Sequence, residues 1–360
     1  MEVRSVTLDN FRNWRHLELE LDTSGTTFIL GNNGQGKTNV VEGIYFAIRN
    51  RSFRVPFRES LILDGDAFLK VKSEVFNQGR RFDTEVLLQR SGDSYFRVNS
   101  KPLRSFQSLL TSFPAVVFQP EDLTLVKGGP GIRRDLLDEL VTMQGKKSSS
   151  TVSLFEKVLQ QRNSLLKQVH GKLDQDAQNT LAVWDDRLGS VGEELASLRE
   201  NVLTELSKWL VEAYAIIAKE SFELTLAYRR SWTGDLLEAL NRSRTTDLQR
   251  GTTTVGPQRD ELDILIGGKV ARYHASQGEA RAIAIATRLA TILFLQQELG
   301  TTPVVFLDDI TSELDEKRVK RLFDSIPKAQ VLVTGTFLPK DFNVEKVLKV
   351  EDGRVTAAIY

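Results

Sequence analysis

The sequence predicts an α/β fold in which a helical lobe is inserted between two parts of one larger unit. Near the N-terminus a short apolar strand, a glycine-rich loop and a helix follow one another over residues 26–49. Residues 152–220 have the periodicity of helices throughout. The last third returns to alternating apolar strands and helices, which is typical of a sheet covered by helices. We therefore expect residues 1–130 and 246–360 to form one unit and residues 131–245 to form the lobe.

Strands account for most of the first hundred residues. "VRSVTL" and "HLELEL" alternate apolar and polar residues, as half-buried strands do. The stretches 67–76, 82–89 and 94–98 predict a β-meander, and "AVVF" at 115–118 predicts a further buried strand. A helix is expected from "RRDLLDELV" onward, after the breaker "KGGPG".

Two helices make up the predicted lobe. Apolar residues spaced alternately by three and four positions run from Leu181 to Val202 and form a heptad stripe. An earlier helix carries Leu154, Val158, Leu165 and Val169, and the polar stretch 171–178 separates the two. We expect a short antiparallel helical hairpin, a few tens of Å long at about 1.5 Å per residue. The stripe is more simply interpreted as packing within the hairpin, and a dimer zipper is the alternative.

The composition excludes several kinds of site. Lys plus Arg and Asp plus Glu both number 48, so any contact with nucleic acid must come from a local patch. The chain has no Cys, which excludes disulfides and thiolate metal sites, and its three His form no ligand motif. The longest apolar stretch, residues 282–295, is too short to span a bilayer. We therefore expect a soluble, cytoplasmic protein.

A phosphate-loop motif stands at residues 31–38. "GNNGQGKT" matches G-x-x-x-x-G-K-[ST] between an apolar strand and a helix. In this motif the loop amides wrap the β-phosphate, the lysine reaches the β and γ oxygens, and the hydroxyl holds Mg²⁺. The guanine signature N-K-x-D is absent, which favours ATP over GTP. The predicted nucleotide-binding residues of the loop are Gly31, Asn32, Asn33, Gly34, Gln35, Gly36, Lys37 and Thr38.

Two adjacent carboxylates follow a buried strand in "PVVFLDDI". Asp308 is in a position to hold Mg²⁺ through water, and Asp309 to orient or deprotonate the attacking water. A helix N-cap is the alternative, but a cap requires one Asp rather than two. We therefore predict Lys37, Asp308 and Asp309 as catalytic residues.

A second motif with the build of an anion site lies in "HASQGEARAIAIATRLA", where a Ser-Gln-Gly turn precedes a long apolar helix. The order of phosphate loop, Gln119 after a strand, this turn, Asp-Asp and "SELD" resembles the ABC-type ATPase head. In that family the Ser-Gly turn caps the γ-phosphate held by a partner's phosphate loop, so that two ATP molecules lie in an isologous dimer. The resemblance implies a signature acting in trans at Ser276, Gln277, Gly278 and Glu279, a D-loop at Ser312 and Asp315, and Mg²⁺ ligands Thr38, Gln119 and Asp308.

Further blocks narrow the resemblance. "LDNFRN", "SFR", "PEDLTLVKGGPGIRRDLLDELV", "TTTVGPQRDEL" and "FLDDITSELD" are similar to blocks of the RecF family of recombination-repair ATPases, and they span residues 8–315. That family is related to the SMC-type chromosomal ATPases but has only a short helical arm. The resemblance implies an ATP-dependent DNA-binding dimer with weak, DNA-dependent ATPase turnover, acting at single-strand gaps and at junctions of double- and single-stranded DNA. It implies RecR and RecO as mediators, loading of RecA on single-stranded DNA, and roles in replication, repair and the SOS response.

The chain departs from the ABC pattern at three places. The usual catalytic Glu is Asp309, whose shorter side chain predicts slow hydrolysis. The switch His is absent, and Thr334 is the residue that could replace it. Gln258 stands where a His is expected, and no role is assigned to it. An SMC-type structural ATPase and the ATPase subunit of a transporter remain alternative functions.

The DNA contacts are predicted from a basic stretch. "RNRSFRVPFR" at 49–58 places Arg51, Arg54 and Arg58 after the phosphate-loop helix, and arginine suits bidentate contacts to phosphate. A solvated loop, or arginines that serve the nucleotide site, is the alternative. Arg12 and Asn13 are predicted to approach the nucleotide from the first strand turn, with a simple turn as the alternative.

Overall fold

The computed structural model describes residues 1–21, 25–103, 106–169, 174–218, 223–310, 315–338 and 344–358. They form two compact units. Unit 1 comprises Met1–Asp122, Glu212–Lys219 and Ala282–Tyr360, and unit 2 comprises Leu123–Val211 and Glu220–Arg281. Residues 246–281 thus lie in unit 2, whereas the sequence grouped them with the C-terminal part. The division into three segments at residues 130 and 245 stays a prediction.

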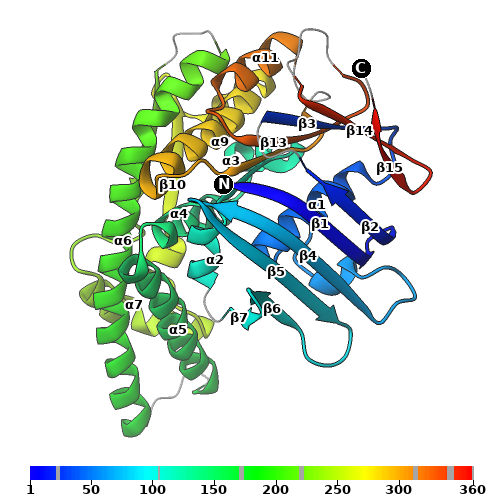
Figure 1. The fold of residues 1–360 in the computed structure, drawn as a ribbon. Coiled ribbons are helices and arrows are strands. Elements are labelled where there is room, and N and C mark those ends of the chain that lie inside the picture. The colour runs from blue at the N-terminus through cyan, green and yellow to red at the C-terminus, as the bar shows by residue number, and fades with distance from the viewer. Residues whose placement is uncertain are drawn as a thin grey trace. The chain divides into compact units, whose positions relative to one another are not determined.

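Unit 1 contains an antiparallel sheet built from the first hundred residues (Figure 1). Its strand order is β2-β1-β4-β5-β6-β7. The meander is present as predicted, because β4 pairs with β5 and β5 with β6. The strands are β1 (Glu2–Phe11), β2 (Trp14–Glu20), β4 (Phe68–Asn77), β5 (Arg80–Gln89), β6 (Tyr95–Val98) and β7 (Lys101–Pro102).

The second sheet of unit 1 combines distant parts of the chain. Its order is β15-β14-β3-β13-β12-β8. All neighbours are parallel except β14 and β15. The strands are β3 (Gly25–Leu30), β8 (Ala115–Phe118), β12 (Val304–Leu307), β13 (Gln330–Gly335), β14 (Lys346–Glu351) and β15 (Arg354–Ala358). Because β3 and β8 come from the N-terminal part and the rest from the last third, the predicted α/β fold with a head split in sequence is confirmed.

Helix α1 (Lys37–Arg49) forms the centre of the core of unit 1. It contacts β1, β4 and β5 of the antiparallel sheet and β13 of the parallel one. The sequence "VVEGIYFAI" is apolar on all sides of the helix, as required of a helix covered on every face. Only Glu42 interrupts it, and that side chain is fully buried. The phosphate-loop helix is therefore held rigidly between two sheets.

The other helices of unit 1 are short, apart from the end of α6 (Gln175–Ala218), whose residues 212–218 belong to unit 1, and a second long helix that the two units share. They are η1 (Arg58–Leu61), α2 (Phe106–Ser112), η2 (Pro120–Asp122) and α11 (Glu316–Ser325). The shared helix α9 (Gln277–Leu299) begins in unit 2 and ends in unit 1.

Unit 2 is mainly helical and includes the predicted hairpin (Figure 1). Its elements are α3 (Leu123–Lys127), α4 (Pro130–Met143), α5 (Lys146–Gln168), most of α6 (Gln175–Ala218), α7 (Leu236–Arg250), η3 (Pro257–Arg259) and α8 (Ala271–His274). A three-stranded antiparallel sheet, in the order β11-β10-β9, consists of β9 (Leu224–Arg229), β10 (Glu261–Ile266) and β11 (Lys269–Val270).

The heptad stripe of α6 is buried within the chain: Leu181, Leu188 and Leu195 are at most 1% exposed. On α5 the predicted apolar face is correct at Val158, which is 2% exposed, and wrong at Leu154, which is 49% exposed. Besides Val158, the buried face of α5 carries Phe155 and Arg162. A buried arginine at the centre of this face explains why an apolar periodicity placed it only in part.

Candidate nucleotide site

The phosphate loop joins β3 to α1 and needs glycine at defined positions. Gly34 and Gly36 have φ of 81° and 96°, which lie in the left-handed region that glycine adopts without strain. A Cβ at Gly36 would lie 2.5 Å from the side-chain nitrogen of Asn13, and a Cβ at Gly31 would lie 2.4 Å from the carbonyl oxygen of Val350. The loop is therefore packed closely against its surroundings.

Lys37, the first residue of α1, has a largely buried side chain. Its ammonium donates a hydrogen bond to the carbonyl of Asn32, 2.9 Å away within the loop. Burial lowers the pKa of Lys37, while the carboxylates of Asp309 and Asp308 act in the opposite direction. The ammonium is thus held over the loop, within the field of both aspartates.

Asp308 accepts two hydroxyl hydrogen bonds from distant parts of the chain. The hydroxyls of Thr38 and Thr334 both donate to its Oδ1, each at 2.8 Å. Thr334 also accepts a bond from the backbone N–H of Asp309, at 2.9 Å. Burial raises the pKa of Asp308, and the two hydroxyl donors lower it in part. Thr334 therefore joins the Asp308 carboxylate to the backbone of Asp309, and Thr38 joins the same carboxylate to the phosphate-loop helix.

These groups surround one cavity of about 350 Å³. Four separate segments of unit 1 contribute to it: the loop with the start of α1, the segment after α1, the end of β12 and the end of β13. Its lining consists of Asn33, Gly34, Gly36, Lys37, Thr38, Asn39, Arg54, Asp309 and Thr334. Glycine amides, a lysine and an arginine on one side and an aspartate on the other suit a phosphate chain bound with a cation.

Gln119 supplies an observation that fits a magnesium ion. It follows β8, whose last residue Phe118 accepts a backbone hydrogen bond from Asp308 at 2.9 Å. The backbone N–H of Gln119 donates to Asp122, but its side-chain oxygen is buried without a hydrogen-bond partner. Together with the Thr38 hydroxyl and the Asp308 carboxylate, this oxygen forms the hard donor set that Mg²⁺ prefers. The residues present therefore fit the ion.

Asn13 and Arg12 differ in their relation to this cavity. Asn13 accepts a hydrogen bond from Asn39 at 2.7 Å and lies against Gly36, so it contacts the phosphate loop. Arg12 instead forms a two-pronged ion pair with the buried Glu42, with both distances 2.9 Å. The guanidinium thus supports α1 rather than lining the cavity.

The three arginines predicted for DNA all make contacts within the chain. Arg54 lines the cavity and donates to Asn39 at 3.1 Å. Arg58 donates to Asn50 at 2.6 Å, and burial lowers its pKa. Arg51 lies 3.3 Å from the hydroxyl of Tyr45. Of the two interpretations left open, service to the nucleotide site is favoured for Arg54, and the assignment of these arginines to DNA stays a prediction.

Glu42 is a residue of this site that sequence reasoning missed. Besides Arg12 it accepts a bond from Ser52 and lies 3.6 Å from Arg54. A single carboxylate inside an otherwise apolar helix was the available signal, because a buried charge requires a partner.

The signature turn belongs to unit 2 and forms a reciprocal helix cap at the start of α9. The Ser276 hydroxyl accepts a bond from the Glu279 N–H at 3.2 Å, and the Ser276 N–H donates to the Glu279 carboxylate at 2.7 Å. These bonds lower the pKa of Glu279. The N–H groups of Gln277 and Gly278, in the first turn of the helix, have no intrahelical partner and remain for an anion.

Of the two predicted D-loop residues, the structure describes Asp315. Asp315 caps α11 by accepting a bond from Arg318 N–H at 3.0 Å. The predicted D-loop residue Ser312 lies outside the described residues.

Two of the five blocks that narrow the family resemblance, "PEDLTLVKGGPGIRRDLLDELV" and "TTTVGPQRDEL", contact each other within unit 2. Arg133 pairs with Glu261 at 2.8 Å, and Arg134 donates to the carbonyl of Asp260 at 2.8 Å. Asp138 pairs with Arg199 at 2.7 Å, which in turn donates to the carbonyl of Pro257. These residues therefore join α4 to the segment before β10 and are structural.

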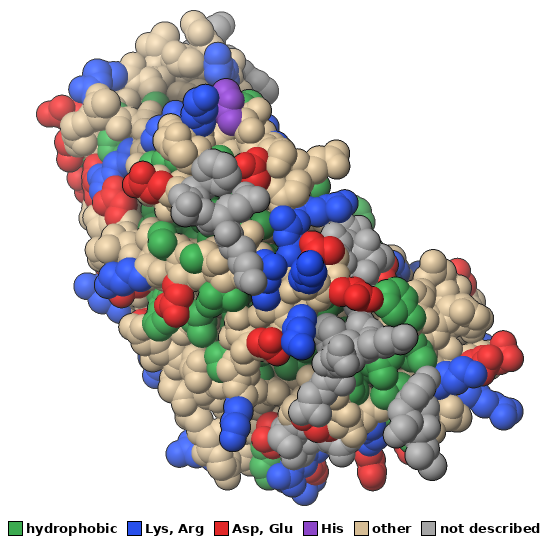
Figure 2. Space-filling model, turned by 90° about the horizontal axis from the view of Figure 1, so that it is seen from above, with side chains coloured by type: hydrophobic (Ala, Val, Ile, Leu, Met, Phe, Trp, Pro, Cys, Tyr) green, Lys and Arg blue, Asp and Glu red, His purple; other side chains and the backbone are tan. Residues whose placement is uncertain are grey.

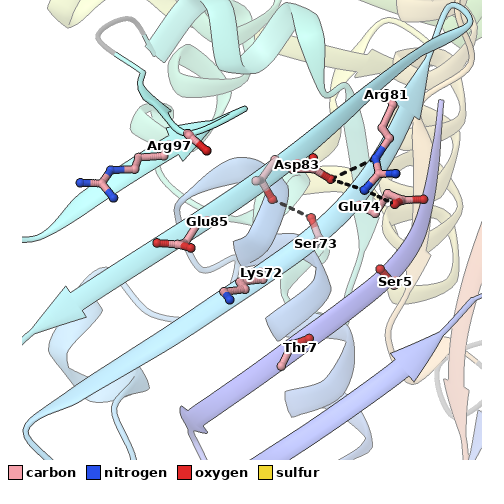
Figure 3. A pocket seen from close by; sticks show the side chains of 11 residues that line it. Ser5, Thr7, Lys72, Ser73, Glu74, Arg81, Asp83, Glu85 and Arg97 are labelled. Atoms are coloured by element: carbon pink, nitrogen blue, oxygen red, sulfur yellow. Dashed lines mark hydrogen bonds and ion pairs between the residues drawn. The ribbon is translucent and has the colours of Figure 1, made fainter.

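A second cavity, of about 370 Å³, lies on the outer face of the antiparallel sheet (Figure 3). Its charges balance, since Lys72, Arg81 and Arg97 face Glu74, Asp83 and Glu85. Arg81 pairs with Glu74 at 2.8 Å and with Asp83 at 3.1 Å. On the face seen in Figure 2, Lys and Arg side chains likewise lie among Asp and Glu side chains. Neither view shows a basic surface of one sign.

The fold and the site together define a P-loop ATPase head of the ABC type. The profile of the RecF/RecN/SMC N terminal domain matches residues 2–351. The DNA replication and repair protein RecF of Acidothermus cellulolyticus is 33% identical over 372 residues, covering 99% of this chain and 100% of that protein. This chain therefore belongs to the RecF family of recombination-repair ATPases, as its sequence motifs predicted.

Solved structures agree with this assignment. The recombination mediator protein RecF with ATP superposes with a TM-score of 0.91 at 29% identity, covering 99% of this chain and 98% of that one. An Smc head domain bound to the C-terminal domain of ScpA, derived from Pyrococcus furiosus, gives 0.58 at 15% identity, with 99% and 96% coverage, which shows a shared fold alone. In the part of the chain that the structure describes, no helix is long and apolar enough to cross a membrane.

Proposed function

We propose that this chain is a cytoplasmic, ATP-gated DNA-binding protein of recombinational gap repair. It binds ATP and Mg²⁺, forms a homodimer on DNA at single-strand gaps and junctions, and leaves after slow, DNA-dependent hydrolysis. In this role it acts with RecR and RecO and helps RecA load on single-stranded DNA. The observation that carries the proposal is the convergence of Thr38 and Thr334 on Asp308 beside Lys37, in a chain of the RecF family.

Different side chains of the site have different roles in ATP binding and hydrolysis. Lys37 and the loop amides bind the β- and γ-phosphate oxygens, with Asn13 supporting the loop at Gly36. Thr38, Asp308 and Gln119 would hold Mg²⁺, which when bound would neutralise charge that develops on the phosphates. Asp309 orients the attacking water and accepts its proton. Arg12 acts through Glu42, as a support of α1.

The signature turn acts on the ATP of the partner chain. Each chain carries its own phosphate loop, and the turn at Ser276 exposes the backbone amides of Gln277 and Gly278 to an anion. Two copies facing each other would complete two such sites by symmetry. Ser312 and Asp315 form the D-loop between them, and the segment 131–245 is the lobe inserted into the head.

The ATP site is tested by Lys37→Ala and Asp309→Asn. Loss of a charge-assisted contact should weaken ATP binding by about 1.5–3 kcal/mol in Lys37→Ala, measured by calorimetry. Asp309→Asn should bind ATP normally and accumulate dimer in sedimentation, because only the step after binding is blocked. Unchanged ATP affinity in the first variant, or wild-type turnover in the second, contradicts the assignments.

DNA gating is tested by fluorescence anisotropy of a labelled gapped duplex across salt, with and without ATP. Affinity falls with salt at a logarithmic slope of about −0.9 per phosphate neutralised, so a dimer should show about twice the monomer slope. Arg51→Ala should reduce that slope without affecting ATP-driven dimerisation. The same change at Arg54, which lines the nucleotide cavity, should impair ATP binding instead. Equal slopes and affinities with and without ATP mean that nucleotide does not gate DNA binding.

A further inference from the structure

The side chain of Lys127 reaches the backbone just before the signature turn. Its ammonium donates to the carbonyl of Ala275 at 2.6 Å, and lies 3.4 Å and 3.3 Å from the carbonyl oxygens of Ala271 and Arg272. All three carbonyls belong to α8 or to the residue that ends it. The carbonyl of Ala271 also accepts the N–H of Ala275 at 3.0 Å, whereas carbonyls at the end of a helix lack such a partner, so a cation there both satisfies and aligns them. Ser276 follows directly after Ala275.

The backbone that carries the Lys127 side chain is held in place before and after this residue. Leu125 and Val126, the two residues before Lys127 on α3, are each 2% exposed, and α3 packs against α8. Arg133 donates to the carbonyl of Leu125 at 2.9 Å and to that of Gly128 at 3.1 Å. Packing and hydrogen bonds therefore fix the backbone around Lys127. This keeps its ammonium close to the carbonyls at the end of α8.

The charge of Lys127 has a second effect at the same place. The carboxylate of Glu279 caps α9 and so lies at the start of the helix where an anion would bind. An uncompensated carboxylate there would oppose the approach of a phosphate. The ammonium of Lys127 bonds the carbonyl of Ala275, and the N–H of the next residue bonds the Glu279 carboxylate, so the positive charge lies near that carboxylate. The bonds from Ser276 lower the pKa of Glu279 most, and the charge of Lys127 lowers it further, by less than those bonds do.

We infer that Lys127 is a positioning residue for the signature turn: it holds the backbone before Ser276 and compensates the charge of Glu279. The inference rests on the proposed function, in which this turn binds the partner's ATP. Lys127 does not touch the nucleotide of its own chain in this scheme. Its loss should therefore affect dimerisation and not ATP binding to the monomer.

The first test compares Lys127→Met with Lys127→Arg, which keeps the charge and the donors. Calorimetry on dilute monomer should give the wild-type ATP affinity for both. In ATP-dependent sedimentation the dimer of Lys127→Met should weaken by roughly tenfold to a hundredfold, since each of the two signature turns in a dimer loses the ammonium that positions it. Lys127→Arg should recover most of that loss. Lys157→Met, which removes a lysine from the exposed face of α5, serves as the matched control and should behave as wild type.

Amide hydrogen exchange separates this inference from the proposed function. Without ATP, Lys127→Met should exchange faster at residues 271–280 than wild type, and equally elsewhere in unit 2. This comparison stays valid even if wild-type chains do not dimerise with ATP, an outcome that would refute the proposed function alone. The double variant Lys127→Met with Glu279→Gln should regain part of the dimer, because the uncompensated carboxylate is gone.

Two results would overturn the role of Lys127. One is unchanged exchange at residues 271–280 in Lys127→Met. The other is a Lys127→Met protein that dimerises with ATP as tightly as a wild-type protein that itself responds to ATP.

Discussion

The buried ion pairs of the hairpin allow a prediction whose size follows from the structure. Arg162 on α5 donates to Asp185 on α6 at 2.7 Å and to Asp247 on α7 at 2.7 Å. It also donates to the hydroxyl of Thr253 at 2.8 Å. The side chains of the arginine and both aspartates are at most 1% exposed. The perturbation is Arg162→Met, which keeps most of the volume and removes the charge.

The expected cost is that of leaving buried carboxylates without their shared cation. Breaking a buried pair in this way destabilises a protein by about 3–5 kcal/mol. Asp185 keeps a second partner, Arg244, at 2.6 Å, whereas Asp247 keeps only neutral donors such as Thr254. With a urea slope of about 2 kcal/mol per molar, the unfolding midpoint should fall by roughly 2 M.

Tryptophan fluorescence is the appropriate assay. Three of the four tryptophans, Trp184, Trp209 and Trp232, belong to unit 2, so urea unfolding followed by emission reports mainly on that unit. Arg244→Met is the matched control. It removes a partner that is 32% exposed and leaves Arg162 in place, so it should cost about 1 kcal/mol.

Removing the carboxylates as well should restore stability. Arg162→Met combined with Asp185→Asn and Asp247→Asn should recover most of the loss, because no buried charge is left without a partner. The reasoning is refuted if Arg162→Met costs no more than Arg244→Met, or if the triple variant is less stable than the single one.

Three further predictions concern unit 1. Thr334→Val should slow steady-state ATP turnover by roughly tenfold or more while calorimetric ATP affinity stays the same, because the hydroxyl that joins Asp308 to Asp309 is lost; equal turnover would contradict this. Gly36→Ala should impair ATP binding more than Gly34→Ala does, since both have positive φ but only the first Cβ meets a neighbour, at 2.5 Å; equal losses would exclude that contact as the cause. The hydrogen bond that His16 donates to the Asp9 carboxylate raises the pKa of the exposed His16. This pair therefore stabilises the fold below the ordinary pKa of 6.5, and the contribution is lost as the pH rises through the folded-state value. In NMR titration Asp9→Asn should lower the pKa of His16 more than Glu18→Gln does, and an unchanged pKa in Asp9→Asn would disprove the pairing.

Much of the site could be predicted from short stretches of sequence. The phosphate loop is encoded within eight residues, because glycines permit its left-handed turns and Lys37 and Thr38 follow directly. The cap of Ser276 by Glu279 is equally local, since it joins positions three residues apart. Strands and helices with a clear periodicity were also predictable, as the β-meander and the helix after the loop demonstrate.

Only the tertiary structure decided which distant side chains meet. The order β3-β13-β12-β8 brings Thr334 to Asp308 and both to Thr38, and no local pattern determines the order of strands in a sheet. Buried polar partners raised the same difficulty, because an apolar periodicity does not predict that Glu42 and Arg162 are buried. Secondary-structure propensity and apolar periodicity depend on a few neighbouring residues. Whether a charged side chain can be buried depends on an oppositely charged or hydrogen-bonding partner, which can come from a distant part of the chain.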